Sequence, residues 1–196
     1  MEKVMLFNGK NLDGWKRRDG TPSDWSVDGD GVVTVVHGDI VSEYEFGDAH
    51  IHVELRIPDM PWASGQDKGN SGVYVQGAYE VQVLDSYGIE VPKIDDCCAI
   101  YSIYPPICNA CKPALEWQTY DIILRAARFN KYGEITEEPR MTVLQNGVVV
   151  QNNIVLPHVT PGNCTDNKRP ARGPLILQDH GCPVSYRNVW VMPLDV

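Results

Sequence analysis

Two neighbouring runs of alternating residues, 73 to 76 and 79 to 84, carry the side chains best suited to contact a ligand. Alternation of this kind is typical of β-strands, in which successive side chains point to opposite faces. One face of the pair is apolar and suits a core, whereas the other carries Tyr74, Gln76, Glu80 and Gln82. Two glutamines with one carboxylate and one phenol favour a ligand surface. An ordinary solvent-exposed face is the alternative.

A second strand, predicted over residues 50 to 57, groups titratable side chains on one face. His50, His52, Glu54 and Arg56 alternate with apolar residues, as expected for a half-buried strand. Glu54 and Arg56 are candidates for an acid–base or cationic role, or they pair with each other at the surface. A pair of histidines on one strand does not by itself define a metal site.

Further candidates lie in loops and at strand ends. Asn70 directly precedes the first polar run, and Trp62 lies in the loop over residues 59 to 69. Gln178 and His180 lie at the end of a strand predicted over residues 175 to 178. His180 could carry chemistry, or it could be a turn residue whose imidazole bonds to the backbone before Gly181.

The elements that must position these residues are short strands separated by turn signals. Asp-Gly pairs near residue 30 and Asn146-Gly147 predict tight hairpins. No convincing helix or repeat interrupts the pattern, and an irregular insertion rich in proline and cysteine spans residues 86 to 113. Long loops of this kind are usually functional. The sequence predicts an all-β fold, a single two-sheet antiparallel sandwich domain over residues 1 to 196.

Composition excludes several classes of partner. The net charge of -9 argues against nucleic acid and against an anionic membrane surface. No apolar run is long enough to span a membrane. Neutral ligands such as sugars remain compatible, and the oligomeric state stays open. The opening residues are too short and too polar for a signal peptide, but a mature chain would look the same, so export stays open.

Six cysteines leave three alternatives open. Cys97, Cys98, Cys108 and Cys111 cluster within the insertion, and two more follow downstream. The even count permits disulfides, whose pairing the sequence does not define. Free buried thiols and a four-thiolate zinc site are the other two interpretations.

Seven segments, taken in order, resemble one known family across residues 6 to 190. They are Leu6-Phe7-Asn8-Gly9 with Leu12-Asp13-Gly14-Trp15, Gly69-Asn70-Ser71-Gly72-Val73-Tyr74, Tyr79-Glu80-Val81-Gln82-Val83-Leu84-Asp85, Glu116-Trp117-Gln118-Thr119-Tyr120-Asp121, Leu144-Gln145-Asn146-Gly147-Val148, Leu177-Gln178-Asp179-His180-Gly181 and Tyr186-Arg187-Asn188-Val189-Trp190. Together they resemble the 3-keto-disaccharide hydrolase domain, formerly a domain of unknown function. The resemblance implies a concanavalin A-like jelly-roll sandwich and a periplasmic or extracellular protein of carbohydrate-degrading bacteria.

Glucanases of this fold carry the pattern Glu-x-Asp-x-x-Glu on one strand, and the chain departs from it. Here the frame reads Glu80-Val-Gln82-Val-Leu-Asp85. Positions 80 and 85 share a face only if a β-bulge intervenes. A retaining glycosidase needs two carboxyl groups about 5–5.5 Å apart, so the departure speaks against direct double-displacement hydrolysis.

A 3-keto sugar offers a different route, because its ketone acidifies the proton on C2 and allows the aglycone on C1 to leave by elimination. This chemistry needs a base, a cation or donor for the enolate, and an acid for the leaving group. The expected catalytic residues are Glu80, His180, Arg56 and Glu54, with Glu80 or His180 as the base. Arg56 or a divalent metal ion would stabilise the enolate.

The expected substrate-binding residues belong to the same polar face and its surroundings. They are Gln82, Tyr74, Gln76, Gln178, Asn70 and Trp62. Trp62 could stack on a sugar ring, or it could pack like any other aromatic side chain. The alternatives to a 3-keto-glycoside hydrolase are a non-catalytic carbohydrate-binding module on the same fold and a glucanase-like glycoside hydrolase.

Overall fold

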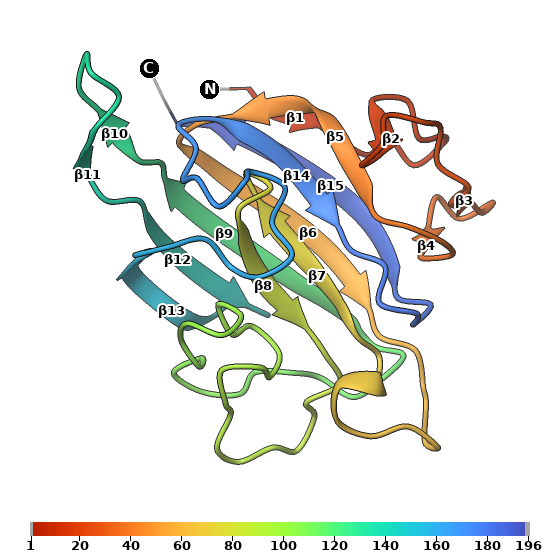
Figure 1. Cartoon of the computed structure of the whole chain (residues 1–196). Helices are drawn as coiled ribbons and strands as arrows, with labels where there is room; N and C mark the ends of the chain where they lie inside the picture. Colours follow the sequence, from red (N-terminus) through yellow and green to blue (C-terminus); the bar gives the residue numbers. More distant parts are fainter. Residues whose placement is uncertain (1, 195–196) are drawn as a thin grey trace.

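The alternating segments of the sequence become the strands of two large antiparallel sheets (Figure 1). The computed structural model describes residues 2–194. The larger sheet has the order β13-β12-β9-β6-β15-β4-β3, with β1 beside β15. Its strands are β13 (Val148–Val155), β12 (Arg140–Gln145), β9 (Trp117–Arg125), β6 (Ala49–Arg56), β15 (Ser185–Pro193), β4 (Val33–Thr34), β3 (Ser26–Val27) and β1 (Val4–Met5).

The second large sheet has the order β2-β5-β14-β7-β8. Its strands are β2 (Trp15–Arg17), β5 (Ile40–Phe46), β14 (Gly173–Leu177), β7 (Ser71–Val75) and β8 (Tyr79–Val83). A small hairpin pairs β10 (Arg128–Phe129) with β11 (Ile135–Glu137), and one 3-10 turn, η1, covers Gly65–Asp67. No helix within residues 2–194 has the length and apolar character needed to cross a membrane.

One core lies between the two sheets. Ile51 and Val53 of β6 are fully buried in the same apolar cluster as Val73 of β7 and Val81 of β8. The predicted alternation of residues 50 to 57 is confirmed, because β6 buries every second side chain. The chain is therefore all-β and antiparallel, and facing sheets around one core are consistent with the predicted sandwich.

The hairpin of β7 and β8 presents its polar side chains away from this core. Tyr74 lies directly opposite Glu80 in the antiparallel register. Tyr74 packs in a separate small cluster with Val41 and Ile176 from neighbouring strands of the same sheet. The predicted division of this hairpin into an apolar face and a ligand-type face is therefore confirmed for Tyr74 and Glu80, which both lie on the outer face.

Gln76 corrects the prediction that it shares this face. The residue lies in the turn after β7, where Gln76 and Gly77 both have positive φ angles, 54° and 62°, as a tight two-residue hairpin turn requires. The turn directs the side chain sideways, and Nε2 donates to the Phe46 carbonyl at 2.9 Å and the Ala171 carbonyl at 3.3 Å. Gln76 is fully buried and therefore joins backbone segments.

Two loops enclose the outer face of the hairpin. Residues 98 to 101 of the insertion run along the free edge of β8. There the backbone amide of Gln82 donates to the Ala99 carbonyl, and the backbone amide of Tyr101 donates to the backbone carbonyl of Glu80. This pairing covers an edge that would otherwise expose unpaired backbone groups. The loop that follows β13 crosses in front of β7 and β8 (Figure 1). The insertion is therefore a structural part of the sheet as well as a wall beside Glu80.

All six cysteines are free thiols. Cys97, Cys98 and Cys111 are buried, whereas Cys108 is exposed. The sequence left open disulfides, free thiols and a zinc site, and in the structure the cysteines are free thiols. Over residues 2–194, no group of three or more histidine, cysteine, aspartate or glutamate side chains is placed to hold a metal ion.

We expect Gln76→Ala to lower the free energy of unfolding by about 1–3 kcal/mol, because the substitution leaves buried carbonyl groups without a donor. Urea unfolding measures the change. Asn152→Ala, at an exposed position of β13, is the control and should alter stability by less than about 0.5 kcal/mol. Equal stability of Gln76→Ala and the unaltered protein would contradict the structural role.

Candidate active site

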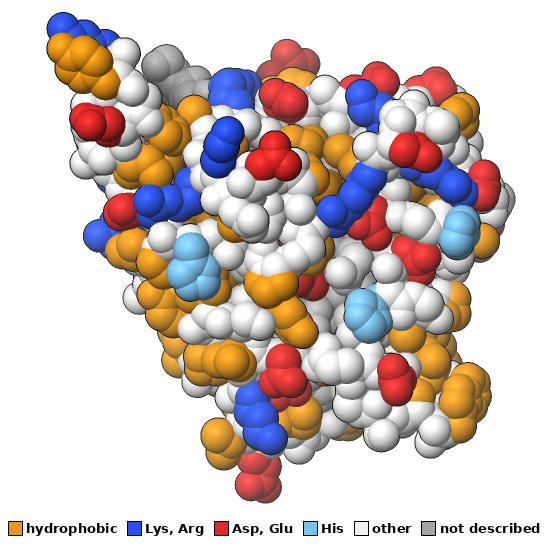
Figure 2. All heavy atoms as spheres, in the orientation of Figure 1, with side chains coloured by type: hydrophobic (Ala, Val, Ile, Leu, Met, Phe, Trp, Pro, Cys, Tyr) orange, Lys and Arg blue, Asp and Glu red, His pale blue; other side chains and the backbone are white. Residues whose placement is uncertain are grey.

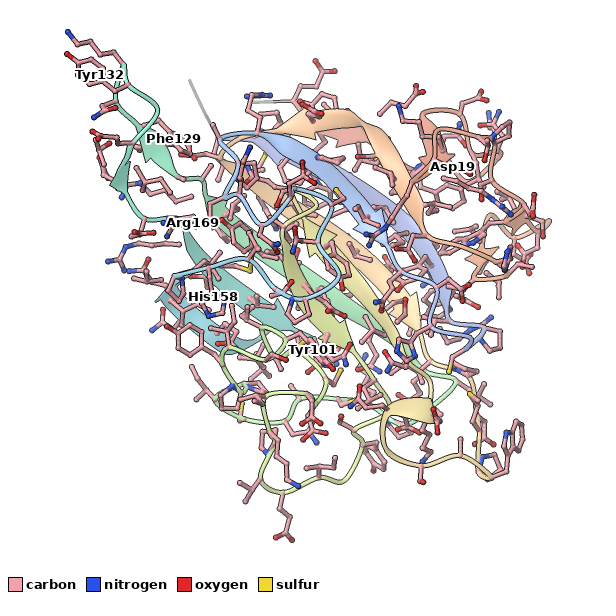
Figure 3. The ribbon with its side chains drawn as sticks, in the orientation of Figure 1. Asp19, Tyr101, Phe129, Tyr132, His158 and Arg169 are labelled. Carbon is pink, nitrogen blue, oxygen red and sulfur yellow. The ribbon has the colours of Figure 1, made fainter. Side chains whose placement is uncertain are left out.

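Glu80 lies at the centre of a small cavity on the outer face of the second sheet. The cavity measures about 140 Å³ and is lined by Gln66, Tyr74, Glu80, Tyr101, Pro161, Gly162, Gln178 and His180. The lining residues come from η1, β7, β8, the segment directly after β14 and both covering loops. Figure 3 shows Tyr101 beside the end of β8 on this face. Four of the predicted site residues, Tyr74, Glu80, Gln178 and His180, are thus brought together.

Tyr74 is the direct partner of the Glu80 carboxyl group. Its hydroxyl oxygen lies 2.8 Å from Glu80 Oε2 and 3.0 Å from the Pro161 carbonyl oxygen, both of which can accept its proton. A phenol has one proton to donate. Tyr74 can therefore donate to the ionised carboxylate, or turn to Pro161 when Glu80 is protonated. Burial and the neighbouring carboxylate raise the pKa of Tyr74, which keeps it protonated.

Glu80 can exchange a proton near neutral pH. Burial raises the pKa of Glu80 to about 7, against the hydrogen bond from Tyr74, which lowers it. The charge of Asp39 raises this pKa further and the charge of Arg18 lowers it. A carboxyl group with this pKa is divided between its acid and base forms at pH 7, the condition that suits a general base.

The backbone beneath Glu80 leaves no space for a side chain. A Cβ atom at Gly72 would lie 2.5 Å from Glu80 Oε1 and 3.1 Å from Gln178 Oε1. Glycine at this position therefore allows the two side chains to lie against the sheet. Gln178 Oε1 is buried and has no hydrogen-bond partner among the described residues. An unpaired buried acceptor beside a cavity is a group that a ligand hydroxyl can satisfy.

A guanidinium group lies close to the Tyr74–Glu80 pair. Arg18 follows β2, its Nε forms an ion pair with Asp39 at 2.6 Å, and one terminal nitrogen donates to the Gly162 carbonyl at 2.8 Å. Its guanidinium carbon lies 5.7 Å from the centre of the Tyr74 ring. Figure 2 shows basic and acidic side chains gathered on the β5 and β14 side of this face. Arg18 thus places a positive charge close to the cavity of Glu80.

Gln82 and Asn70 reach the cavity through Gln66. Gln82 Nε2 donates to Gln66 Oε1 at 3.1 Å, and Asn70 Nδ2 donates to the same oxygen at 3.1 Å and to the Gln66 carbonyl at 2.7 Å. Both predicted residues therefore position a third amide that lines the cavity. Their predicted direct contact with substrate remains a proposal.

Glu54 and Arg56 lie on the other sheet and are not part of this cavity. Glu54 accepts hydrogen bonds from Arg187 at 2.6 Å and from Asn188 at 2.8 Å. Burial opposes ionisation of Glu54, but these two hydrogen bonds lower its pKa overall. The guanidinium of Arg56 lies 4.9 Å from the centre of the Trp117 ring. These contacts correct the predicted set, because β6 directs both side chains to the outer face of the larger sheet.

The remaining candidates also lie elsewhere. Trp62 is 79% exposed in its loop and does not line the cavity. His50 and His52 lie on the outer face of β6, where both rings contact Asp121 Oδ1, at 2.9 Å and 2.8 Å. This cluster joins β6 to β9 through hydrogen bonds.

Sequence reasoning missed Gln66, Tyr101, Arg18 and Asp39. Gln66 and Tyr101 come from the two irregular segments on either side of the hairpin, and irregular segments have no periodicity that indicates where a side chain points. Arg18 lies more than sixty residues from Glu80 in the sequence. The functional character predicted for the insertion was the one signal that pointed towards Tyr101.

Comparison with known proteins assigns the chain to a family. A model of the 3-keto-alpha-glucoside-1,2-lyase-like domain matches residues 2–192. The chain belongs to this family, which confirms the resemblance inferred from the sequence. Among curated proteins, none matches the chain.

Solved structures agree with this assignment. A candidate glycosyl hydrolase from Parabacteroides distasonis ATCC 8503 is 38% identical, with a TM-score of 0.88 over 98% of this chain and 84% of the other. A second one from the same organism is 22% identical, with a TM-score of 0.71 over 98% and 94%. An alginate lyase solved with an alginate trisaccharide shares 9% identity and a TM-score of 0.51 over 89% and 86%. The last two show the fold alone. Family and first relative together support a carbohydrate-active function.

We expect Tyr74→Phe to raise the pKa of Glu80 above about 7, because the substitution removes the hydrogen bond that stabilises the ionised carboxylate. Carbon-13 NMR of the side-chain carboxyl group during a pH titration measures the change. Tyr79→Phe is the matched control, since the Tyr79 hydroxyl lies on the core side without a hydrogen-bond partner. A Glu80 pKa that is the same in all three proteins would contradict the assigned contact.

Proposed function

We propose that the protein cleaves the glycosidic bond of a 3-keto-glycoside by elimination followed by hydration, with Glu80 as the general base. The observation that carries the proposal is a buried carboxyl group with a pKa of about 7 in a cavity. The other lining side chains offer amide, phenol and imidazole groups. Membership of the 3-keto-alpha-glucoside-1,2-lyase-like family supports the choice of substrate.

Glu80 starts the proposed reaction at C2 of the sugar. Its ionised form removes the C2 proton, which the C3 ketone makes acidic, and the electron pair of the C2–H bond becomes part of an enolate. The enolate collapses, a C1–C2 double bond forms, and the C1–O bond to the aglycone breaks. A base with a pKa close to the working pH combines a large ionised fraction with adequate basicity.

The enolate oxygen requires hydrogen-bond donors or a positive charge. Arg56, which the sequence suggested for this role, lies on the other sheet, so other residues must supply them. Gln178 Nε2 donates to the Tyr74 hydroxyl at 3.4 Å and has a second proton for an enolate oxygen, and Arg18 brings a guanidinium close enough to alter the pKa of Glu80. Donors fixed before the reaction stabilise a developing oxyanion more effectively than mobile water. We assign the enolate-stabilising role to these two residues.

His180 serves as the acid for the departing oxygen in this scheme. It lines the same cavity as Glu80 and is exposed, so it can exchange protons with solvent between turnovers. Its proton goes to the aglycone oxygen as the C1–O bond breaks. Water then adds to C1 through its oxygen and gives one proton to His180, while the proton held by Glu80 returns to C2, so that both side chains recover their starting forms and the products are the free 3-keto sugar and the aglycone.

Hydrolysis through two carboxylates has less support. Glu80 is the one carboxylate among the described residues that line the cavity. Asp85, the second carboxylate of the glucanase frame, lies beyond the end of β8 and forms an ion pair with Lys68 at 3.0 Å. A double displacement needs both groups on one substrate. The contact of Asp85 therefore favours elimination.

We also propose that the two sheets follow the concanavalin A-like jelly-roll type. Strands that are consecutive in the chain alternate between the sheets, as β5 to β6, β6 to β7 and β14 to β15 do. Alternation between facing sheets is a feature of Greek-key sandwiches. The family assignment supports the same type.

A turnover assay on a 3-keto-glucoside and its unoxidised parent tests the reaction. We expect release of the aglycone from the keto sugar, and a loss of kcat of about 10²- to 10⁴-fold in Glu80→Gln, because an amide cannot act as a base. Glu43→Gln, at an exposed position of β5 in the same sheet, is the control and should retain activity. Binding without release from either sugar would contradict the proposal and favour a carbohydrate-binding module.

The pH dependence of catalysis should report Glu80. Because the base must be ionised, kcat/KM for the keto sugar should rise with pH around a pKa of about 7. Steady-state rates between pH 5 and pH 9 measure the profile. A profile that is flat through neutral pH would remove Glu80 as the base.

The contribution of Glu80 to the free energy of unfolding should fall as the pH rises, whereas kcat/KM should increase. The folded pKa of about 7 lies above the ordinary glutamate value of 4.5, so folded Glu80 holds a proton that the unfolded chain has lost. This contribution is fully present below about pH 4.5 and is lost as the pH rises through 7, by at most roughly 3 kcal/mol. Glu80→Gln should therefore gain stability relative to the unaltered protein from pH 5 to pH 8 in urea unfolding. Parallel stability curves would contradict the raised pKa.

A further inference from the structure

A second, larger cavity adjoins the cavity of Glu80. It measures about 420 Å³, compared with about 140 Å³ for the first, and Gln66 lines both. The larger cavity lies between the segment that carries η1 and the start of the insertion, with Leu84, Ile89 and Lys93 in its lining. A glycoside cleaved beside Glu80 has two parts, the sugar and the aglycone. If the sugar occupies the cavity of Glu80, the adjoining cavity is available to the aglycone.

The shared wall is held in place from three sides. Gln66 Nε2 donates to the Asp95 carbonyl at 3.0 Å, while Gln66 Oε1 accepts from Gln82 and Asn70 at 3.1 Å each. These contacts fix Gln66 at the boundary between the two cavities, and one proton of its Nε2 remains available to a ligand. The glycosidic oxygen would lie at this boundary, with the sugar ring on the Glu80 side.

The lining of the larger cavity combines two apolar side chains, Leu84 and Ile89, with three charged residues, Lys93, Asp95 and Asp96. Leu84 is buried and Ile89 lies at the rim, 36% exposed. The rim is ordered, because the Ile89 amide donates to Ser86 and the Ile89 carbonyl accepts from Asn109 at 2.9 Å. The Asp96 carboxylate, although part of the lining, is engaged by the Ser86 hydroxyl at 3.1 Å and the Lys93 amide at 2.7 Å.

The cavity on the opposite side of the site has a different character. It measures about 290 Å³ and is lined by Arg17, Arg18, Asp19, Gly38 and Asp39. Four of its five lining residues are charged, compared with three of seven in the larger cavity, and charged side chains would lose hydration against an apolar ligand. Of the two neighbouring cavities, the one beyond Gln66 is therefore the better place for an apolar group. Figure 2 shows hydrophobic side chains among charged ones over the loops at that lower end.

We propose that the cavity formed by Leu84, Ile89 and the boundary residue Gln66 is a subsite for an apolar, ring-containing aglycone of the substrate. The inference rests on the proposed function and extends it to the leaving group. An engineered apolar cavity of about 150 Å³ holds one benzene molecule, so about 420 Å³ accommodates a fused two-ring group. Substrates of this class are 3-keto-glycosides of apolar alcohols and phenols, rather than 3-keto-disaccharides.

The test compares three 3-keto-glucosides of the same anomer, the methyl, the 2-naphthylmethyl and the glucosyl derivatives. Methyl and naphthylmethyl both leave as primary alcohols, so they differ mainly in apolar bulk. We expect kcat/KM to be at least about tenfold higher for naphthylmethyl than for methyl, since discrimination by an apolar pocket is of this size. Ile89→Asp should remove this preference.

Val91→Asp is the matched control, because Val91 belongs to the same segment but is 78% exposed and lies outside the cavity lining. It should retain the full preference for naphthylmethyl. Loss of the preference in both variants, no preference in the unaltered protein, or a preference for the glucosyl derivative that Ile89→Asp removes would each overturn the apolar subsite.

A binding measurement separates this inference from the proposed reaction. Free 2-naphthylmethanol should perturb the NMR signals of the Leu84 and Ile89 methyl groups in the unaltered protein, and the binding should weaken at least about tenfold in Ile89→Asp. Absence of turnover for all three keto sugars with this binding intact would reject the proposed reaction and keep the apolar cavity. Turnover without any naphthylmethanol binding would reject the subsite alone.

Discussion

Glu80 can hold a proton near neutral pH because two loops keep its carboxyl group away from water. A glutamate on the outer face of a sheet would ordinarily be solvated and ionised. Here the segment around Tyr101 pairs with the edge of β8, and Pro161 and Gly162 cover Tyr74. Desolvation then outweighs the hydrogen bond from Tyr74. The other features of the site follow from this burial, including the glycine at position 72 that makes room for the carboxyl group.

The two outer faces of the protein show how environment separates similar side chains. Glu54 on the central strand β6 and Glu80 on the edge strand β8 are both enclosed glutamates with aromatic and cationic neighbours. Two donors, Arg187 and Asn188, surround Glu54 and lower its pKa. Glu80 has a single donor and a cation already paired with Asp39, so its pKa rises. An ion-paired carboxylate ties strands together, whereas a poorly compensated one is available for proton transfer.

The covering loops also account for how one sandwich can serve different ligands. The relatives that share the fold at low identity include an alginate lyase, and a fold does not define a reaction. In this chain the strands supply Tyr74 and Glu80, while irregular segments supply Gln66, Tyr101 and the approach to the larger cavity. Loops are the part of a domain that changes most easily without loss of the core.

The sequence by itself determined the strands, the hairpins and the two faces of the central pair. Alternation at residues 50 to 57 and the Asn146-Gly147 turn are local signals, and the structure has β6 and the β12–β13 hairpin where they predict them. Tyr74 and Glu80 follow from the same alternation. The seven motifs in order over residues 6 to 190 together identified the family.

Only the tertiary structure decided which polar residues meet. The sequence suggested Arg56 as the cation and gave no signal for Arg18. In the structure β6 places Arg56 on the outer face of the other sheet, whereas Arg18, which follows β2, lies beside Tyr74. Gln76 left its expected face because the hairpin turn requires positive φ angles there. Periodicity fixes the face of a strand on which a side chain lies. It says nothing about which distant loop covers that face, and that covering sets the pKa of Glu80.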